Sequence, residues 1–318
     1  MSTIGTPLMW TFFAAFVLAA LFIDYISMQS RGAKKVSIKD AIFWSVIWVL
    51  VAFVFVGWMW WYLGGVSGDK QANVKAAEFI TGFLIEKALA VDNIFVFLLL
   101  FGYFAVKPEH QNRTLLIGII GALVLRGILI VFGAWIISKF HWILYIFGAF
   151  LVFTGIKMWW ATGHEADLET NLALRWIRKH IKISPHYDGE KFFTFVDGVK
   201  MATPLLVVIM LIGIVDIIFA VDSIPAIFAI TTDPFIVLTS NVFAMLGLRA
   251  MYFLLTGMHD TFHLLSYGLS IVLILIGAKM LLMDIYHIPV SWSLIATVVV
   301  LASTMVLSVA FPPKHETG

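Results

Sequence analysis

Nine long apolar stretches run through the chain, and they constrain its fold more than any other feature. Each is close to the roughly 20 residues that a helix needs to cross about 30 Å of hydrocarbon. Hydrophobic residues make up 61% of the 318 residues and charged residues only 13%, a balance that ordinary soluble domains do not have. The sequence therefore predicts an all-α polytopic membrane protein with about nine transmembrane helices. The stretches lie at 7–27, 41–63, 78–104, 114–137, 142–161, 202–231, 235–256, 264–285 and 290–311.

Basic residues are distributed unevenly between the connecting segments. If the N-terminus is outside, thirteen lysines and arginines lie in inside segments and three lie outside. Cytoplasmic loops carry the excess of positive charge. We therefore expect a multi-pass protein of the cytoplasmic (inner) membrane, with the N-terminus outside and the C-terminus in the cytoplasm. The inside residues are Arg31, Lys34, Lys35, Lys39, Lys107, Arg113, Arg175, Arg178, Lys179, Lys182, Lys191, Lys200 and Lys314, and the outside residues are Lys70, Lys75 and Lys139.

Charge and cysteine content exclude several classes of function. The net charge of only +2 gives no general attraction to nucleic acid, so no nucleic-acid partner is expected. The chain has no cysteine, which excludes thiolate metal sites, disulfides and cysteine nucleophiles. The first stretch has neither a basic n-region nor an Ala-x-Ala cleavage site, so we expect it to stay as an uncleaved span.

An acidic motif occurs twice inside the apolar stretches. In each copy two carboxylates lie six residues apart, and the second is followed by a polar residue and isoleucine. A single charge costs about 2.5–3.5 kcal/mol at the centre of a membrane helix, so such residues must pair, face water or hold an ion. If both copies converge, their hard oxygen donors suit Mg²⁺, Ca²⁺ or Mn²⁺ and poorly select Zn²⁺ or Cu⁺. The candidate metal ligands are Glu86, Asp92 and Asn93 in the first copy and Asp216, Asp222 and Ser223 in the second.

The duplication continues in the helices that follow each motif. Helices 114–137 and 235–256 each carry one arginine near mid-span, and helices 142–161 and 264–285 share a histidine, a tyrosine, a glycine and a Lys-Met pair at one offset of 122 residues. Because three crossings reverse the direction of the chain, the second unit is inverted relative to the first. The sequence predicts two N-terminal helices (1–77), a first three-helix unit (78–161), a cytoplasmic loop (162–200), a second three-helix unit (201–285), and a last helix with a cytoplasmic tail (286–318).

Four basic residues in the repeated helices, Arg126, Lys157, Arg249 and Lys279, balance the four carboxylates in charge and are candidates for charge-balancing or gating roles. Neutral pairing without a metal is therefore feasible, and four structural salt bridges are the alternative to a cation site. If a cation does bind, it displaces protons or basic partners from the buried carboxylates, so exchange of protons for metal is expected.

Lys87 and Asp24 lie outside the duplicated set. We expect a local partner or water for Lys87, and the inner end of the first span for Asp24.

The helices that carry the motifs can be interrupted. Glu86 and Asp92 point roughly 120° apart on a straight helix, so that helix is either surrounded by protein or unwound between them. Pro225 follows the second motif and favours a local break between 216 and 225, because proline disrupts the bonding of the preceding turn. Inverted-repeat transporters build mid-membrane sites at such breaks.

The loop at 162–200 contains two local signals. Leu168, Leu172, Trp176 and Ile177 recur near helical spacing among basic residues, which predicts an amphipathic helix lying on the inner leaflet. Residues 192–198 then predict a short hairpin with an Asp-Gly turn. The loop is interpreted as a linker between the two membrane halves, with a regulatory domain as the alternative.

These motifs resemble the TerC family of integral membrane proteins, and within it the Alx-like branch, over nearly the whole chain. The strings that carry the resemblance are Glu86-Lys87-Ala88-Leu89-Ala90-Val91-Asp92-Asn93, Asp216-Ile217-Ile218-Phe219-Ala220-Val221-Asp222-Ser223-Ile224-Pro225-Ala226-Ile227-Phe228-Ala229, Thr232-Asp233-Pro234-Phe235-Ile236-Val237 and Leu246-Gly247-Leu248-Arg249-Ala250-Met251-Tyr252-Phe253. The resemblance implies manganese homeostasis by efflux of Mn²⁺ across the cytoplasmic membrane, with the acidic residues of both motifs, Asn93 and Ser223 in the site.

The leading hypothesis is thus a Mn²⁺ exporter that works by alternating access, without catalytic activity or a resident cofactor. Its partners are the transported Mn²⁺ and the lipid bilayer. A membrane scaffold or interaction protein in stress resistance or membrane protein assembly is the main alternative, and it predicts dependence on the 162–200 loop. An intramembrane aspartyl hydrolase is disfavoured, because it needs two carboxyls sharing a proton at close range and the sequence has no other hydrolase signature. A passive cation channel is also disfavoured, because the basic residues would obstruct the pore.

Overall fold

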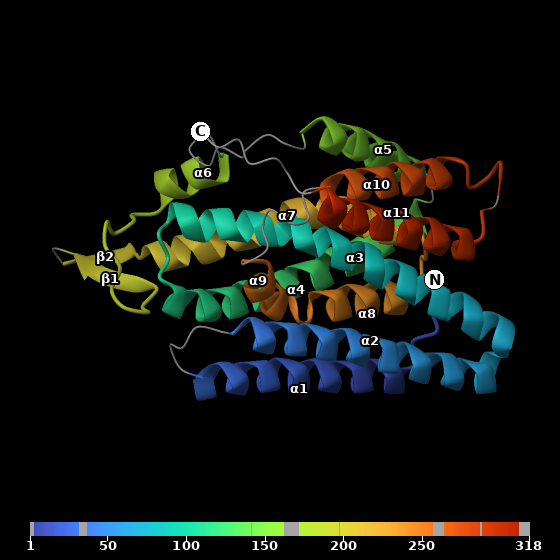
Figure 1. Ribbon diagram of the computed structural model, residues 1–318, viewed down its shortest axis with the longest axis horizontal. Helices are drawn as coiled ribbons and strands as arrows, with labels where there is room; N and C mark the ends of the chain where they lie inside the picture. The colour runs from blue at the N-terminus through green and yellow to red at the C-terminus, as the bar shows by residue number, and fades with distance from the viewer. Residues whose placement is uncertain are drawn as a thin grey trace.

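The computed structural model describes residues 3–31, 37–140, 142–161, 172–196, 198–256, 264–286 and 288–311. Eleven helices and one hairpin form this part of the chain (Figure 1). The helices are α1 (Pro7–Arg31), α2 (Ile38–Ser67), α3 (Asp69–Tyr103), α4 (Pro108–Lys139), α5 (Ile143–Ala161), α6 (Leu172–His180), α7 (Pro204–Phe228), α8 (Pro234–Met245), α9 (Leu248–Leu255), α10 (Leu265–Leu281) and α11 (Val290–Ala310). The strands are β1 (Phe193–Val196) and β2 (Val199–Ala202).

The helices confirm the predicted all-α membrane fold. Seven segments of the described chain are long and apolar enough to cross a membrane, with α8 and α9 counted together as Pro234–Leu255. The helix with the first acidic motif, α3, and the shorter apolar helix α10 complete the nine predicted spans. Large apolar side chains such as Phe12, Val54 and Trp160 are exposed on the outer helices. Such a surface is stable against lipid and not against water.

Reciprocal contacts between α5 and α10 reveal an internal two-fold relation. A Cβ added at Gly277 would lie 2.7 Å from the carbonyl oxygen of Gly148, and one at Gly155 would lie 2.8 Å from that of Ser270. The offset of 122 residues found in the sequence maps Gly148 onto Ser270 and Gly155 onto Gly277. Each contact is therefore the symmetry mate of the other, as in an isologous interface.

The contacts of α3 with α8 and of α7 with α4 obey the same relation. Gly82 of α3 meets Ser240 of α8, and Gly118 of α4 meets Ile212 of α7. An offset of 130 maps Gly82 onto Ile212, and the offset of 122 maps Gly118 onto Ser240. In Figure 1, α3 and α7 run in opposite directions, as do α4 and α8. The chain therefore contains the predicted inverted repeat, and each unit packs its first helix on the second helix of the other.

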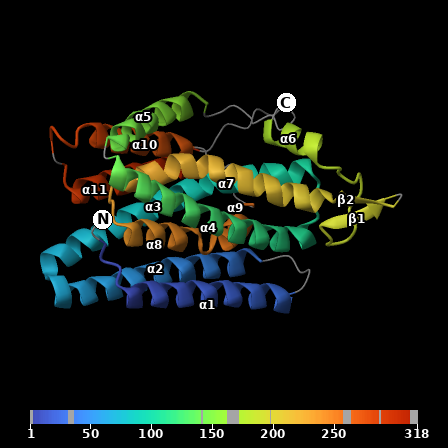
Figure 2. The ribbon, with the colours of Figure 1, turned by 180° about the vertical axis from the view of Figure 1, so that it is seen from behind.

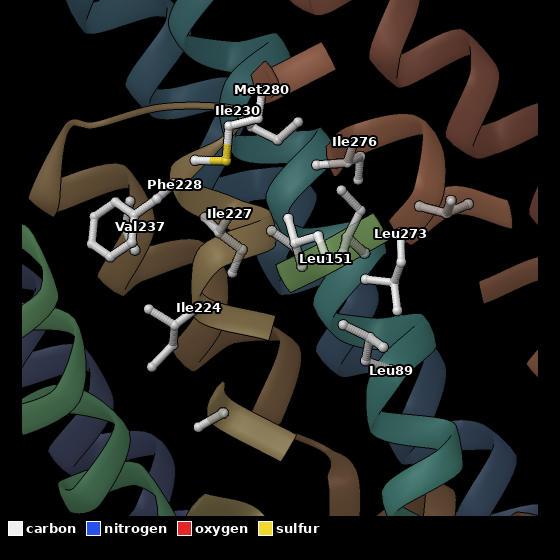
Figure 3. Close-up of a cluster of buried hydrophobic side chains, with 14 of the residues drawn as sticks. Leu89, Leu151, Ile224, Ile227, Phe228, Ile230, Val237, Leu273, Ile276 and Met280 are labelled. Carbon is white, nitrogen blue, oxygen red and sulfur yellow. The ribbon is translucent and has the colours of Figure 1, made fainter. Parts of the chain in front are cut away.

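The two units share an apolar core where α3, α5, α7 and α10 meet (Figure 3). Leu89 of α3, Leu151 of α5, Ile224 of α7 and Leu273 of α10 are all buried in this cluster. Around it, α1 and α2 cover one side of the bundle, and α11 packs on α10 and α3 (Figures 1 and 2). Since α3 begins at Asp69, residues 69–77 continue into the first unit without interruption.

The predicted break near Pro225 is wrong. The helix α7 is continuous from Pro204 to Phe228, and Pro225 lies in its last turn. There the proline removes only one hydrogen bond, and the chain leaves the helix through bonds from the Ala229 and Thr231 amides to the carbonyls of residues 225 and 227. The first motif is likewise in a continuous helix, because α3 extends from Asp69 to Tyr103.

A break occurs instead between α8 and α9. Gly247 has φ +81°, a left-handed conformation that favours glycine. A Cβ at this position would lie 2.6 Å from Trp48 of α2. The break therefore requires glycine both for its φ angle and because a tryptophan from another helix fills the space that a side chain would need.

The predicted amphipathic helix and hairpin of the loop are confirmed, as α6 and β1–β2. Residues 162–171, including Leu168, lie outside the described residues. The apolar residues Leu174 and Ile177 of α6 are buried against the protein core, whereas Trp176 is exposed. Part of the apolar face of α6 thus packs on the protein, while Trp176 stays exposed, and the position of this helix on the inner leaflet remains a prediction.

Candidate cation site

One arginine joins the two acidic motifs in the middle of the bundle. The Arg126 guanidinium of α4 donates to both oxygens of Asp216, from Nε at 3.1 and 3.0 Å and from Nη2 at 2.8 Å. Its Nη1 donates to Glu86 and, at 3.3 Å, to the hydroxyl of Ser223. All four residues are buried, with exposed fractions of 1% or less. The carboxylates of the two inverted units therefore meet around a single cation.

The fold brings these groups together through its repeat. Glu86 lies four residues after Gly82, where α3 meets α8, and Asp216 lies four residues after Ile212, where α7 meets α4. Four residues are about one helical turn, so each carboxylate lies on the same face of its helix as the contact with the other unit, one turn further along. Arg126 in α4 then reaches both. The acidic cluster is stable inside the membrane because the guanidinium offers a planar set of donors that fits carboxylates.

Two buried acceptors of α3, about two helical turns apart, are left without a hydrogen bond in the described structure. Glu86 Oε2 and Asn93 Oδ1 have no donor among the described residues, although the Ser223 hydroxyl lies beside the Glu86 carboxylate. Buried acceptors usually have a partner, and an exception points to a site for water or an ion. Both oxygens belong to the predicted ligand set, but only Glu86 Oε2 lies at the Arg126 centre, where it is an acceptor that Arg126 leaves unused.

The second carboxylates of the motifs differ from the first. Asp222 is half-buried, faces α5, and accepts a hydrogen bond of 3.2 Å from Thr154. Lys157, one turn further along α5, is exposed and is near enough for its charge to act on Asp222. Asp216 and Ser223, by contrast, face Arg126. The side chain of Asp92 lies outside the described residues.

The other two basic candidates are not near the acidic motifs. Arg249 of α9 pairs with Asp24 of α1 and donates to Asn112 of α4 at 2.8 Å. Lys279 of α10 donates to Ser293 of α11 at 2.9 Å. The expectation that both would balance the carboxylates is wrong: Arg249 lies on the short helix beyond the Gly247 break, and Lys279 reaches towards the last helix.

Lys87 has a local partner, as expected, at the break of the second unit. Its ammonium donates to the carbonyls of Ala244 and Leu246 at 3.1 and 3.3 Å, where α8 ends. The repeat places Ile217 at the equivalent position of α7, opposite the unbroken helix α4. A lysine thus occurs where the neighbouring helix exposes carbonyls, and an isoleucine where the helix continues.

Comparison with known proteins gives the family. A model described as the integral membrane protein TerC family matches residues 71–316. The chain belongs to this family. The matched segment contains both acidic motifs, Arg126 and the whole inverted repeat.

Relatives of this TerC-family chain are similar over their full length. A protein of Salmonella typhi named as a membrane-bound redox modulator, Alx, is 50% identical over 308 residues, or 97% of this chain and 96% of its own. The protein of the same name from Escherichia coli (strain K12) is 49% identical over 316 residues, or 99% and 98%. An uncharacterised membrane protein of Myxococcus xanthus is 44% identical over 306 residues, or 96% and 93%. No solved structure matches the chain significantly.

A buried polar residue outside the acidic motifs is Asn241, which hydropathy alone does not single out. Asn241 of α8 is fully buried, and neither atom of its amide has a partner among the described residues. A signal was present, because Thr239, Ser240 and Asn241 form a polar run inside an apolar helix. Thr239 and Ser240 bond to carbonyls of their own helix. Of these three residues, only Asn241 therefore has a side chain left without a partner in the described structure.

The described side chains do not form a ready-made metal site. No group of three or more histidine, aspartate or glutamate side chains within the described residues has the geometry to hold a metal ion. The centre instead contains two carboxylates around the Arg126 cation, and one of their oxygens, Glu86 Oε2, is unused in the described structure. Chemically, this arrangement can exchange one cation for another if Arg126 withdraws.

Proposed function

We propose that this TerC-family protein exports Mn²⁺ across the cytoplasmic membrane by alternating access. The observation that carries the proposal is the meeting of Glu86 from one inverted unit and Asp216 from the other on the single buried cation of Arg126. A site shared by two oppositely oriented units can open to either side when the units move against each other. Carboxylate, amide and hydroxyl oxygens are ligands that suit a hard divalent cation.

In this mechanism Arg126 occupies the site when the cargo is absent. An incoming cation binds Glu86 and Asp216 as the guanidinium withdraws, and Asn93 and Ser223 supply neutral oxygens. Asp222 is half-buried and faces α5, so it receives the cation on the path to the centre. When the cation leaves, Arg126 neutralises one of the two carboxylates, and a proton taken up by the other completes the exchange. The export cycle is thus coupled to protons.

The orientation follows from the distribution of basic residues. The N-terminus is outside, the C-terminus is cytoplasmic, and α6 with the β hairpin lies on the cytoplasmic side. The substrate is the ion itself, so the protein needs neither catalytic chemistry nor a resident cofactor. The redox role in the relatives' name finds no support in thiol chemistry, because the chain has no cysteine.

The test is flux of Mn²⁺ through the purified protein in liposomes. Asp216→Asn removes one charge from the centre and is expected to abolish flux, and Glu86→Gln should do the same. The matched control is Asp24→Asn, which changes another arginine-paired carboxylate of a membrane helix away from the centre. Wild-type flux in both central variants would contradict the site, and equal loss in all three would indicate a general defect.

A membrane scaffold is the second candidate function, and one feature favours it. The hairpin and α6 form an ordered structure outside the membrane spans, attached by burial of Leu174 and Ile177. If the protein works as a scaffold, replacing α6 and the hairpin with an unrelated linker should abolish its function in cells. Asp216→Asn should then leave that function intact. Manganese tolerance of cells that carry each variant separates the two functions.

A further inference from the structure

A groove with a basic lining opens beside α6 and the β hairpin, which lie together at one end of the molecule (Figures 1 and 2). Its volume is about 690 Å³. The wall is formed by residues 178–185, by Phe104 after α3, and by Met201 of β2. Four of these residues are basic and none is acidic: Arg178, Lys179, His180 and Lys182. The groove therefore presents a concentrated positive charge that the proposed transport site does not use.

The acidic residues nearest in sequence are engaged elsewhere. Asp188 pairs with Lys191 and accepts from Thr194, and Glu190 pairs with Arg113. These contacts hold the pKa of the Asp188 carboxyl below its usual value, chiefly through the hydrogen bond from Lys191. Its negative charge is thus retained and directed at a residue outside the groove.

The basic residues of the groove have no carboxylate partner within the described parts of the chain. Arg178 donates to the Tyr103 hydroxyl at 3.2 Å, and the His180 ring contacts the carbonyl of Trp176. Lys179 and Lys182 are exposed, and neither makes an ion pair with a described residue. The positive charge is therefore available to an external anion.

The groove is preformed rather than a loose run of charged side chains. The Lys182 carbonyl accepts from the Ala202 amide at 2.9 Å, and the Ser184 amide donates to the Ala202 carbonyl at 2.8 Å. These bonds fix the basic segment on β2. Below it, Leu174 and Ile177 hold α6 to the protein core. A site whose backbone is already fixed loses less entropy when a ligand binds.

The groove also lies where membrane helices end. Phe104 directly follows α3, and α7 begins two residues after β2. Trp176, with 55% of its surface exposed, lies on α6. Tryptophan is typical of the membrane–water interface because its ring is apolar and its N–H is polar. The lining itself adds apolar residues, among them Ile181, Ile183 and Met201, which can contact the glycerol and upper acyl region of a lipid.

We propose that this groove binds the phosphate headgroup of an anionic phospholipid such as phosphatidylglycerol. Lysines and arginines beside a membrane span attract acidic lipids, and here they surround a hollow with apolar contacts. Free phosphate shares the anionic chemistry but cannot use those contacts or the membrane-side position. A lipid in this groove ties α6 and the hairpin to the membrane next to the ends of α3 and α7.

The experiment measures thermal unfolding of the full-length protein in detergent with added phosphatidylglycerol, phosphatidylcholine or inorganic phosphate. Phosphatidylglycerol is expected to raise the melting temperature of the wild type more than phosphatidylcholine does. In Lys179→Gln/Lys182→Gln, phosphatidylglycerol should bind about 30-fold more weakly at low salt, because each lysine contributes about a factor of five. The matched control, Lys70→Gln/Lys139→Gln, removes two exposed cations elsewhere and should keep the wild-type response.

Equal binding of phosphatidylglycerol to the wild type and to Lys179→Gln/Lys182→Gln would overturn the proposal. Inorganic phosphate that reproduces the full effect would also overturn it, since the groove would then be a site for a free anion. The measurement needs no metal flux, so its outcome is independent of the proposed transport function.

Discussion

At the scale of single residues, Arg126 decides what the central carboxylates can do. Arg126→Gln leaves Glu86 and Asp216 buried without their cation, and removing one partner of a buried ion pair costs about 3–5 kcal/mol. We expect a lower melting temperature for this variant, and a larger recovery on addition of Mn²⁺ than the wild type shows. Unfolding in detergent, with and without Mn²⁺, measures both effects.

The control for this prediction is Arg249→Gln, which removes an arginine paired with a carboxylate of α1, away from the centre. Its loss of stability should not be recovered by Mn²⁺. If Mn²⁺ stabilises Arg126→Gln no more than it stabilises the wild type, Arg126 does not occupy a cation site, and its role is structural.

The ammonium of Lys87 stabilises the end of α8 through two carbonyl groups. Lys87→Met removes the donor to the Ala244 and Leu246 carbonyls, and an unsatisfied buried acceptor costs about 1–3 kcal/mol. Ile217→Met, at the equivalent position of the second unit, conserves volume and should cost less than about 1.5 kcal/mol. Equilibrium unfolding of the two variants checks this difference. Equal losses would mean that the ammonium does not stabilise the end of α8.

The sequence predicts the central residues better than their partners. Hydropathy makes any charge in a span conspicuous, so Glu86, Asp216 and Arg126 are all found without a structure. Which arginine meets which carboxylate depends on three-dimensional packing. The offset of 122 maps Arg126 onto Leu248, and Arg249, one residue later and beyond the break at Gly247, pairs with Asp24. The repeat in the sequence does not predict the break at Gly247 that separates α8 from α9.

At the scale of elements, the crossing of α5 and α10 depends on glycine. A Cβ at Gly277 would lie 2.7 Å from the Gly148 carbonyl oxygen, which belongs to the backbone and cannot rotate away. Gly277→Ala should therefore force the helices apart and cost about 1–3 kcal/mol. Gly57→Ala, where a Cβ would meet no atom within 4 Å, should have little effect or slightly stabilise its helix. Thermal unfolding of the two alanine variants tests this, and a neutral Gly277→Ala would show that the helices can separate at little cost.

The presence of an element is predicted where the chain itself carries the signal, although its boundaries differ from those expected. The Asp-Gly turn predicted the hairpin, and apolar spacing predicted α6. Pro225, a local signal, predicts the interruption at the wrong residue, whereas the left-handed Gly247 lies against Trp48 of another helix. Where an element ends because of a tertiary contact, its end cannot be predicted from the sequence alone.

At the scale of the whole molecule, the duplication is the property that the sequence predicts most fully. The offset of 122 residues was visible as matched side chains, and it reappears as reciprocal contacts at Gly148, Gly155, Ser270 and Gly277. The offset can be predicted from the sequence because it depends only on which residue types recur along the chain. The packing of each unit's first helix on the other unit's second helix is a matter of three-dimensional assembly, and only the structure reveals it.

This exchanged packing gives a direct test of movement between the units. A Cβ added at Gly82 would lie 3.4 Å from the Cβ of Ser240, and one added at Gly118 would lie 3.5 Å from the Cβ of Ile212. Disulfides need Cβ atoms about 3.5–4.5 Å apart, so Gly82→Cys/Ser240→Cys and Gly118→Cys/Ile212→Cys should both form cross-links. The natural chain has no cysteine, so no other thiol interferes.

If Mn²⁺ export requires the two units to move against each other, each oxidised double variant should lose flux in liposomes, and reduction should restore it. The four single-cysteine variants, treated with the same oxidant, control for the substitutions themselves. Cross-linking is measured by the shift in electrophoretic mobility after cleavage of the chain in the 162–200 loop, which leaves the halves joined only by the disulfide. Undiminished flux with a fully formed bridge at both positions would mean that these crossings stay fixed during transport. The moving parts would then have to be sought in α5, α10 and the short helix α9.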